Sequence, residues 1–308
     1  MSRSPASARP PVVFALPAHR AVLPGTLSDR SAPAVRDCSF ERFANGELCL
    51  RLNESVGGRV CAVLGSLAPP DEQMLSVLLL AHTLRREGAK RVVALLPYLG
   101  YARQDQAEPG QSLGVAWAGA LLKGVGVEIV ITLDVHSPEA VDCLPMPVVS
   151  ISPARLFADA LQARGVSGVT VVAPDEGAIA RSDAVARAAG IETPVTYLRK
   201  RRDARGVTHQ ALVGDVTSRI VIVDDILDTG GTLISACRGL RSAGAEEITV
   251  MVTHGLFTGE RWRKLAGLGV ERVYTTDSVP DSGDRGSEIV EVLPIGELVV
   301  DALMSATT

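Results

Sequence analysis

The sequence lacks closely paired cysteines, long apolar runs and a large excess of one charge. Its five cysteines, Cys38, Cys49, Cys61, Cys143 and Cys237, include no CxxC pair, which argues against a structural zinc site and against a disulfide framework. We therefore expect reduced thiols in a cytoplasmic protein. The longest apolar runs are far shorter than a membrane span, and a net charge of −4 argues against a broad nucleic-acid surface. We expect neither a membrane nor a nucleic-acid partner.

The chain is long and apolar enough to form a large folded core. It has 308 residues, of which 46% are apolar and 21% charged, a composition typical of a globular protein with two domains or one large domain. Residues 1–11 are rich in Pro, Ser and Arg and are predicted to form a disordered tail. The apolar stretch that follows is interrupted by Pro17, His19 and Arg20, so we do not interpret it as a signal peptide.

Segments typical of strands alternate with segments typical of helices along most of the chain. Predicted strands include residues 12–16, 47–52, 60–64, 91–96, 128–133, 169–172, 193–197, 209–213 and 248–252. Predicted helices include residues 71–87, 113–123, 153–164, 181–189, 233–242 and 295–304. This alternation favours an α/β fold built on a doubly wound, mostly parallel sheet.

Two segments of the first half recur in the same order in the second half. GAKRVVALLP at residues 88–97 resembles GAEEITVMVT at 244–253, and VEIVITLDVHS at 127–137 resembles VERVYTTDSVP at 270–280. We interpret this echo as a duplication that gives two similar α/β domains, joined near residues 148–152.

The most informative stretch is RIVIVDDILDTGGTL, at residues 219–233. Residues 220–223 form an apolar, largely β-branched run that predicts a buried strand, which Asp224 and Asp225 are expected to end. A glycine-rich turn at residues 228–232 follows, and then a helix pattern, so free backbone N–H groups and a helix N-terminus meet at a point suited to a phosphate. Carboxylates beside a phosphate repel it unless they bind hydroxyl groups or Mg²⁺. A ribose phosphate offers hydroxyl groups next to its phosphate.

These residues resemble the fingerprint of the type I phosphoribosyltransferases and of the ribose-phosphate pyrophosphokinases. Further segments are similar to elements of the pyrophosphokinase family, namely FANGE at 43–47, YARQD at 101–105, DVH at 134–136, PDEGA at 174–178 and KRR at 200–202. The resemblance implies two phosphoribosyltransferase-type domains and a homo-oligomer, a hexamer or its dimer units. It also implies that diphosphate passes from Mg²⁺-ATP to ribose 5-phosphate, giving PRPP and AMP.

The resemblance further implies where the domains lie and what individual residues do. An ATP-side domain would span residues 1–150, with the final helix at 295–304 packed back on it, and a ribose-5-phosphate domain would span residues 151–294. Lys200 and Arg202 would be catalytic, and His136 and Asp175 would bind Mg²⁺. The ATP-binding residues would be Phe43, Asn45, Glu47, Arg103, Gln104 and Asp105. The residues that bind ribose 5-phosphate would be Asp224, Asp225, Asp228, Thr229, Gly230, Gly231 and Thr232.

The residue types suit these roles to different degrees. Phe43 can stack on a purine, and Arg103 can pair with phosphate oxygens in a bidentate way. His136 is an unusual partner for Mg²⁺, which prefers oxygen, so its assignment rests on the resemblance alone. Lys200 and Arg202 belong to a charged stretch, residues 199–207, that we expect to be a flexible loop between two strands.

The chain departs from the family's pattern at two places. After Asp105 it continues QAEPGQS, where many members continue with basic residues, and Ala178 stands where many have a second glycine. The first change removes positive charge near the triphosphate and is expected to alter ATP affinity, or regulation by phosphate or ADP. The second leaves less backbone freedom in the diphosphate loop.

Two other functions share part of this pattern. A phosphoribosyltransferase that consumes PRPP would have the central motif, but FANGE, YARQD and DVH would have no role in it. A non-catalytic, regulatory homologue of the synthetase would be expected to have a disrupted catalytic loop or phosphate turn, whereas Lys200, Arg202 and Asp225 are all present.

Overall fold

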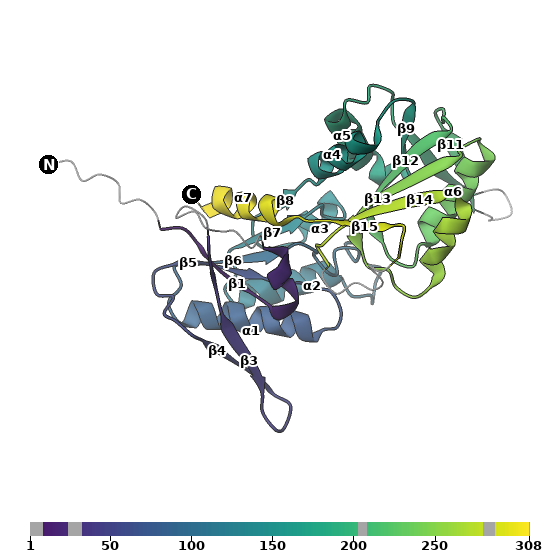
Figure 1. Ribbon diagram of the computed structural model, residues 1–308. Helices are drawn as coiled ribbons and strands as arrows, with labels where there is room; N and C mark the ends of the chain where they lie inside the picture. Colours follow the sequence, from purple (N-terminus) through teal and green to yellow (C-terminus); the bar gives the residue numbers. More distant parts are fainter. Residues whose placement is uncertain (1–8, 24–32, 203–207, 280–286, 308) are drawn as a thin grey trace. The chain divides into compact units, whose positions relative to one another are not determined.

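The computed structural model describes residues 9–23, 33–202, 208–279 and 287–307, and these form two compact units. The first unit comprises Met1–Ile151 together with Ile295–Thr308, and the second comprises Ser152–Pro294 (Figure 1). Of the helices in the described ranges, none is long and apolar enough to cross a membrane.

The first unit contains a six-stranded parallel sheet in the order β2-β1-β5-β6-β7-β8. Its strands are β1 (Val12–Ala15), β2 (Ala34–Arg36), β5 (Val60–Leu64), β6 (Arg91–Leu96), β7 (Ile129–Leu133) and β8 (Val148–Ile151). Its helices are the short 3₁₀ helix η1 (Pro17–Val22) and α1 (Glu72–Arg86), α2 (Gly114–Gly124), α3 (Pro138–Asp142) and α7 (Gly296–Thr307). The central strands are almost wholly buried, as expected for a parallel sheet that is covered on its faces.

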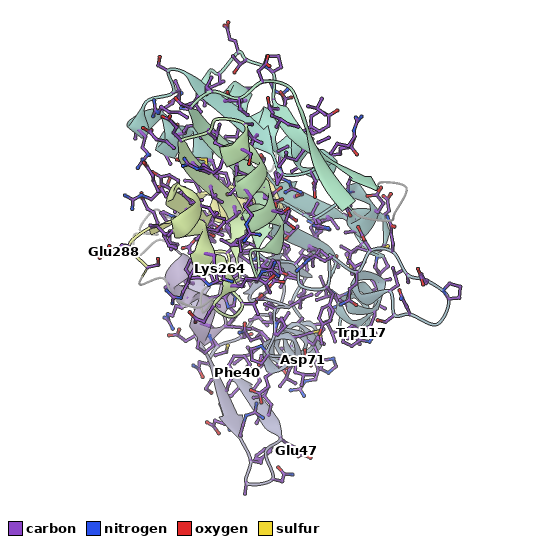
Figure 2. The ribbon with its side chains drawn as sticks, turned by 90° about the vertical axis from the view of Figure 1, so that its right-hand side faces the viewer. Phe40, Glu47, Asp71, Trp117, Lys264 and Glu288 are labelled. Carbon is purple, nitrogen blue, oxygen red and sulfur yellow. The ribbon has the colours of Figure 1, made fainter. Side chains whose placement is uncertain are left out.

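The last helix, α7, is part of the first unit although it ends the chain. It packs against β7 and β8, and Arg91 Nη1 donates to the Ala306 carbonyl at 3.4 Å. A separate antiparallel hairpin, β3 (Cys38–Arg42) and β4 (Leu48–Leu52), projects from this unit, with Glu47 at its tip (Figure 2).

The second unit contains a seven-stranded sheet in the order β11-β10-β9-β12-β13-β14-β15. Its strands are β9 (Val169–Ala173), β10 (Thr196–Arg202), β11 (Thr208–Val213), β12 (Arg219–Leu227), β13 (Glu247–Gly255), β14 (Val270–Thr276) and β15 (Val290–Leu293). Its helices are α4 (Ala154–Arg164), α5 (Ile179–Ala189) and α6 (Gly231–Ser242), with the 3₁₀ helices η2 (Glu176–Ala178) and η3 (Arg261–Leu268). β10 and β11 pair antiparallel, and the other pairs are parallel.

Alternate residues of β12 face opposite layers of the second unit. Ile220 and Ile222 pack in the cluster that contains α6 and η3, whereas Val221 and Val223 pack in the cluster that contains α4 and α5. This period of two is the ordinary geometry of a strand. It explains why the sequence shows an unbroken apolar run here, because both faces of the strand are buried.

The two sheets repeat the same strand order, which gives the sequence echo its structural meaning. β6 and β7, which carry the first copies of the echo, are parallel neighbours. β13 and β14, which carry the second copies, are also parallel neighbours. Each of these pairs is flanked by one further strand on either side, which gives the orders β5-β6-β7-β8 and β12-β13-β14-β15. The predicted α/β class with two similar, mostly parallel sheets is therefore confirmed.

Several predicted boundaries are wrong, and tertiary pairing explains them. β12 continues to Leu227 because it pairs with β13 as far as Gly255, so Asp224 and Asp225 lie within the strand. β10 continues to Arg202 because it pairs with β11, so residues 199–202 of the predicted loop are strand. The rest of that predicted loop, residues 203–207, lies outside the described residues. A strand, β8, occupies residues 148–151, and the second unit begins directly after it, at Ser152.

The predicted disordered tail is also partly wrong. Residues 1–8 lie outside the described residues, but Pro11 is buried, and its carbonyl accepts a hydrogen bond from the Ala34 amide at 3.0 Å. The Pro10 carbonyl accepts from Arg59 Nη2 at 3.1 Å. The last residues of this segment are thus fixed by the edge of the first sheet.

Candidate functional site

The predicted acidic residues of the second unit gather at one edge of its sheet. β9 and β12 are parallel neighbours, so their carboxyl ends meet, and this edge is where open α/β sheets bind ligands. Asp175 lies just beyond the end of β9, and Asp224 and Asp225 lie near the end of β12. The structure therefore brings one predicted metal ligand and the predicted sugar-binding pair to the same edge.

Asp224 and Asp225 form a closely coupled acidic pair. The Asp225 amide donates to Asp224 Oδ1 at 3.0 Å, and Asp225 is 5% exposed. The period of the strand turns Asp225 toward α5, where Arg181 Nη2 lies 3.9 Å from Asp225 Oδ2. Burial, followed by repulsion from Asp225, raises the pKa of Asp224 well above its usual value, and Arg181 opposes this shift only in part. Groups that donate hydrogen bonds to this pair, or a cation, would stabilise its charged form.

This pair should cost stability at neutral pH. A carboxyl group whose pKa is raised on folding destabilises the fold once pH exceeds its ordinary pKa, and the destabilisation is complete above its raised pKa. We therefore expect Asp224→Asn to raise the melting temperature at pH 7, with the gain shrinking as pH falls toward the ordinary range for a carboxyl group. Thermal melts of wild type and variant at several pH values measure this. A variant that melts below wild type at pH 7 would contradict it.

The predicted phosphate turn leads into a helix whose start has no side-chain cap. α6 begins at Gly231, earlier than predicted, with Gly230 as its N-cap residue, and its first turn carries no acidic residue. The backbone N–H groups at this end are thus open to an anion, which the helix dipole favours.

Trp262 of η3, which our sequence analysis did not select, holds this turn in place. It is buried, its ring centroid lies 4.8 Å from that of Phe257, and a Cβ on Gly230 would lie 2.9 Å from its Cα. Gly230 also has φ +81°, a conformation that side chains disfavour. Only glycine fits at this position.

We expect Gly230→Ala to destabilise the protein by about 1–3 kcal/mol, because it adds left-handed strain and a clash with the backbone of Trp262. Gly239→Ala, in the same helix, is the matched control. A Cβ there meets nothing within 4 Å, so it should instead stabilise by about 0.5–1 kcal/mol. Denaturant melts of both variants test the pair of predictions, and equal effects of the two substitutions would contradict the account of Gly230.

Arg261, the first residue of η3, is a second feature that our sequence analysis missed. Its Nη1 lies 3.7 Å, and the Thr229 hydroxyl 3.9 Å, from the point where a Cβ on Gly231 would be. A guanidinium and a hydroxyl therefore flank the start of α6. No local sequence motif indicates that Arg261 is near the turn, because it reaches the turn only through the packing of η3 against α6.

The predicted diphosphate loop is a short helical turn tied to β10. Asp175 caps η2, its Oδ1 accepting from the Ala178 amide at 3.2 Å. Glu176 Oε1 accepts from Arg199 Nε at 2.8 Å. Lys200 and Arg202 follow Arg199 on β10, but the structure describes only their backbone. The strand that carries the predicted catalytic cations is thus joined to the loop that carries Asp175.

In the first unit, the YARQD and DVH segments lie side by side. They follow β6 and β7, which are parallel neighbours. Ser137 Oγ donates to the Asp105 carboxylate and accepts from the Ala140 amide at 3.0 Å, so one hydroxyl joins the loop to the start of α3. Arg103 and Gln104 are exposed, and His136 is half-buried. The structure gives Asp105 a role in supporting the loop.

FANGE forms the exposed tip of the β3–β4 hairpin. Phe43 is 57% exposed, and Asn45 Oδ1 accepts from the Glu47 amide at 3.1 Å, which closes the turn. Arg42 Nη2 lies 3.2 Å from Glu72 Oε1, at the first residue of α1. The exposed ring of Phe43 thus belongs to the turn of the projecting hairpin, whose tip is marked by Glu47 in Figure 2.

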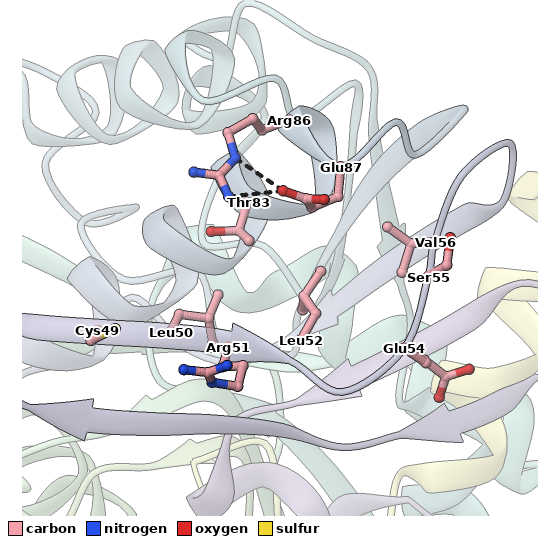
Figure 3. Close-up of a pocket in the computed structure, with 10 residues that line it drawn as sticks. All are labelled: Cys49, Leu50, Arg51, Leu52, Glu54, Ser55, Val56, Thr83, Arg86 and Glu87. Carbon is pink, nitrogen blue, oxygen red and sulfur yellow. Dashed lines mark hydrogen bonds and ion pairs between the residues drawn. The ribbon is translucent and has the colours of Figure 1, made fainter.

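A pocket of about 470 Å³ lies elsewhere in the first unit, between β4, the segment that follows it and the end of α1 (Figure 3). Its walls include Arg51, Glu54, Arg86 and Glu87, and Arg86 Nη2 donates to Glu87 Oε1 at 2.8 Å. None of its lining residues is a predicted site residue. Its charges largely balance, which does not favour a phosphate.

The donors fit a metal that arrives with a phosphate ligand better than a preformed metal centre. Within the ranges that the structure describes, no three His, Cys, Asp or Glu side chains are grouped closely enough to hold a metal. Mg²⁺ in phosphate sites is typically held by one or two carboxylates, phosphate oxygens and water. Asp175 and the Asp224–Asp225 pair supply oxygen donors of this kind.

The fold and this edge of the sheet define the class of protein. Two similar, mostly parallel α/β sheets, one joining an acidic pair to a glycine turn at a helix start, are of the phosphoribosyltransferase type. Residues 12–126 match the family model for the N-terminal domain of ribose phosphate pyrophosphokinase, and residues 149–277 match that for the phosphoribosyl transferase domain.

Individual relatives agree with the family models. The ribose-phosphate pyrophosphokinases of Vibrio parahaemolyticus and Vibrio cholerae are 31% and 32% identical over 283 residues, which is 90% of this chain and of each relative. The crystal structure of phosphoribosylpyrophosphate synthetase from Mycobacterium smegmatis superposes with a TM-score of 0.84 at 28% identity, covering 97% of this chain and 99% of that one. This chain therefore belongs to the ribose-phosphate pyrophosphokinase family. The predicted family and enzyme class are confirmed.

Proposed function

We propose that this protein transfers diphosphate from Mg²⁺-ATP to the anomeric hydroxyl of ribose 5-phosphate, giving PRPP and AMP. The observation that carries the proposal is the coupled pair of half-buried Asp224 and buried Asp225, directly ahead of the uncapped start of α6. The 2- and 3-hydroxyls of the sugar donate to the two carboxylates, which relieves their repulsion. The 5-phosphate accepts from the N–H groups of residues 228–232 and from the hydroxyls of Thr229 and Thr232.

On the nucleotide side, Arg103 pairs with phosphate oxygens and Gln104 with a polar edge of the nucleoside, while Asp105 supports their loop through Ser137. Phe43, Asn45 and Glu47 contribute to the adenine pocket from the projecting hairpin. We propose that they do so across an interface in a homo-oligomer, built as a hexamer or from dimer units. Exposed apolar side chains on the first unit support an interface there, with Phe43 57%, Leu75 56% and Trp117 47% exposed.

The chemistry follows from the placement of charge. The oxygen of the anomeric hydroxyl attacks the β-phosphorus of ATP and its proton is released to water. The bond from that phosphorus to the α–β bridging oxygen breaks, and AMP leaves with the bridging oxygen. The Asp pair orients the sugar, and Lys200, Arg202 and Arg103 neutralise charge on the moving oxygens. Asp175 of the second unit and His136 of the first are the residues that we propose as Mg²⁺ ligands, and the metal would polarise the phosphoryl oxygens.

Release of AMP from ATP, Mg²⁺ and ribose 5-phosphate by the purified protein tests the proposed reaction. A PRPP-consuming phosphoribosyltransferase would release no AMP here, but would consume PRPP when offered a base. A regulatory homologue would do neither. The match of residues 12–126 to the synthetase's own N-terminal domain supports the synthetase over a plain phosphoribosyltransferase.

Lys200→Ala should lower turnover by about 10²–10³, the usual effect of removing one preorganised charge that stabilises the transition state. Ribose 5-phosphate and ATP should still bind, because the substitution leaves the Asp224–Asp225 pair, the turn at residues 228–232 and the YARQD loop unchanged. Lys264→Ala, at an exposed lysine of η3, is the control for loss of a positive charge in the same unit. Initial rates of AMP release measure the effect, and an unchanged rate in the Lys200 variant would remove this residue from the mechanism.

A further inference from the structure

The YARQD loop begins with a residue whose backbone is strained and whose neighbour is closely packed on one side. Tyr101 has φ +67°, a left-handed conformation that costs free energy for a residue with a side chain. Gly100 is packed so closely that a Cβ on it would lie 2.2 Å from the Leu67 carbonyl oxygen. The loop backbone is therefore fixed on one side by the segment that follows β5. Strain that persists at a ligand-binding loop must be held in place by neighbouring contacts.

The Tyr101 side chain supplies two such contacts. Its hydroxyl donates to Asp71 Oδ1 at 2.9 Å, and its ring meets Trp117 edge to face, with centroids 5.3 Å apart. The hydrogen bond to Asp71 raises the pKa of the Tyr101 hydroxyl, so the group stays protonated and remains a donor.

Asp71 occupies the N-cap position of α1, yet its side chain makes no capping hydrogen bond. Aspartate at this position usually caps its own helix. Here the carboxylate accepts from a loop residue instead (Figure 2 labels Asp71 and Trp117). The Asp71 carboxylate thus binds the YARQD loop instead of capping α1.

The far end of the loop is anchored as well, through the hydrogen bond between Ser137 and Asp105. Arg103 and Gln104 lie between these two anchors and are exposed. The Gln104 amide donates to the Tyr101 carbonyl at 2.9 Å, so the backbone of Gln104 follows that of Tyr101.

We propose that Tyr101, held by Asp71 and Trp117, is a positioning residue that fixes Arg103 and Gln104 in the geometry that binds the nucleotide. This inference rests on the proposed function, because it deepens the account of the same nucleotide site. The contacts are at the surface, where one hydrogen bond adds little stability. Their effect is on the shape of the loop, and removing them changes nucleotide affinity rather than folding.

Two substitutions separate the anchors. Tyr101→Phe removes the hydroxyl and keeps the ring against Trp117. Tyr101→Gly removes both contacts while accepting the left-handed backbone, so it does not add strain. Ser76→Ala is the matched control, since it removes an exposed hydroxyl of α1, which donates to the Glu72 carbonyl at 2.8 Å, without touching the loop.

The affinity for Mg²⁺-ATP is measured by calorimetric titration, together with KM for each substrate, kcat and the melting temperature. We expect Tyr101→Phe to weaken ATP binding about threefold to tenfold, the equivalent of one hydrogen bond, and Tyr101→Gly to weaken it further. KM for ribose 5-phosphate and the melting temperature should not change in the Phe variant. Ser76→Ala should match wild type throughout.

Equal ATP affinities of wild type and Tyr101→Phe would overturn the proposal, and so would a failure of both proteins to bind ATP. So would a rise in both KM values together, or a fall in melting temperature that tracks the loss of affinity, since either marks a merely structural role. A wild-type protein that releases no AMP, but whose ATP affinity still falls in the Phe variant, contradicts the proposed function and supports the positioning role.

Discussion

The second unit places two coupled carboxylates, half-buried Asp224 and buried Asp225, ahead of a helix start that has no side-chain cap. Burial, and then repulsion from Asp225, raises the pKa of Asp224, and both carboxylates would repel a phosphate. Arg181 from α5 offsets part of this charge, and the N–H groups at the start of α6 have no side-chain cap. The sugar phosphate that we propose for this site would reconcile these elements, because its hydroxyls would satisfy the carboxylates while its phosphate would bind at the helix end.

The repeated parallel sheet places such elements together in each unit. Parallel strands end at a common edge, so residues far apart in the sequence meet there. In the described ranges, the residues other than glycine with positive φ values are Tyr101, Asp134 and Phe257. They lie in the segments that follow β6, β7 and β13, respectively. The strained backbone thus lies in the loops that carry the candidate site or support it, which is where strain is usually retained.

Much of the fold, and the central motif, could be predicted because their signals are local. The apolar run, acid pair and glycine turn at residues 219–233 indicate a strand, a turn and a helix start without any distant partner. The length of β10 could not be predicted, because pairing with β11 overrides the loop-like charge of residues 199–202. Trp262 and Arg261 were missed because they reach the turn only through tertiary packing. The contact between Tyr101 and Asp71 joins residues far apart in sequence, with no motif to announce it.

The central claim, that the Asp224–Asp225 pair is satisfied by sugar hydroxyls, is tested most directly by comparing two ligands that differ in one hydroxyl. Thermal melts with ribose 5-phosphate and with 2-deoxyribose 5-phosphate at equal concentration measure the stabilisation that each gives. The account predicts a clearly larger rise in melting temperature with the ribose compound, because the deoxy sugar leaves a buried carboxylate without a donor. Equal rises for the two sugars would contradict it.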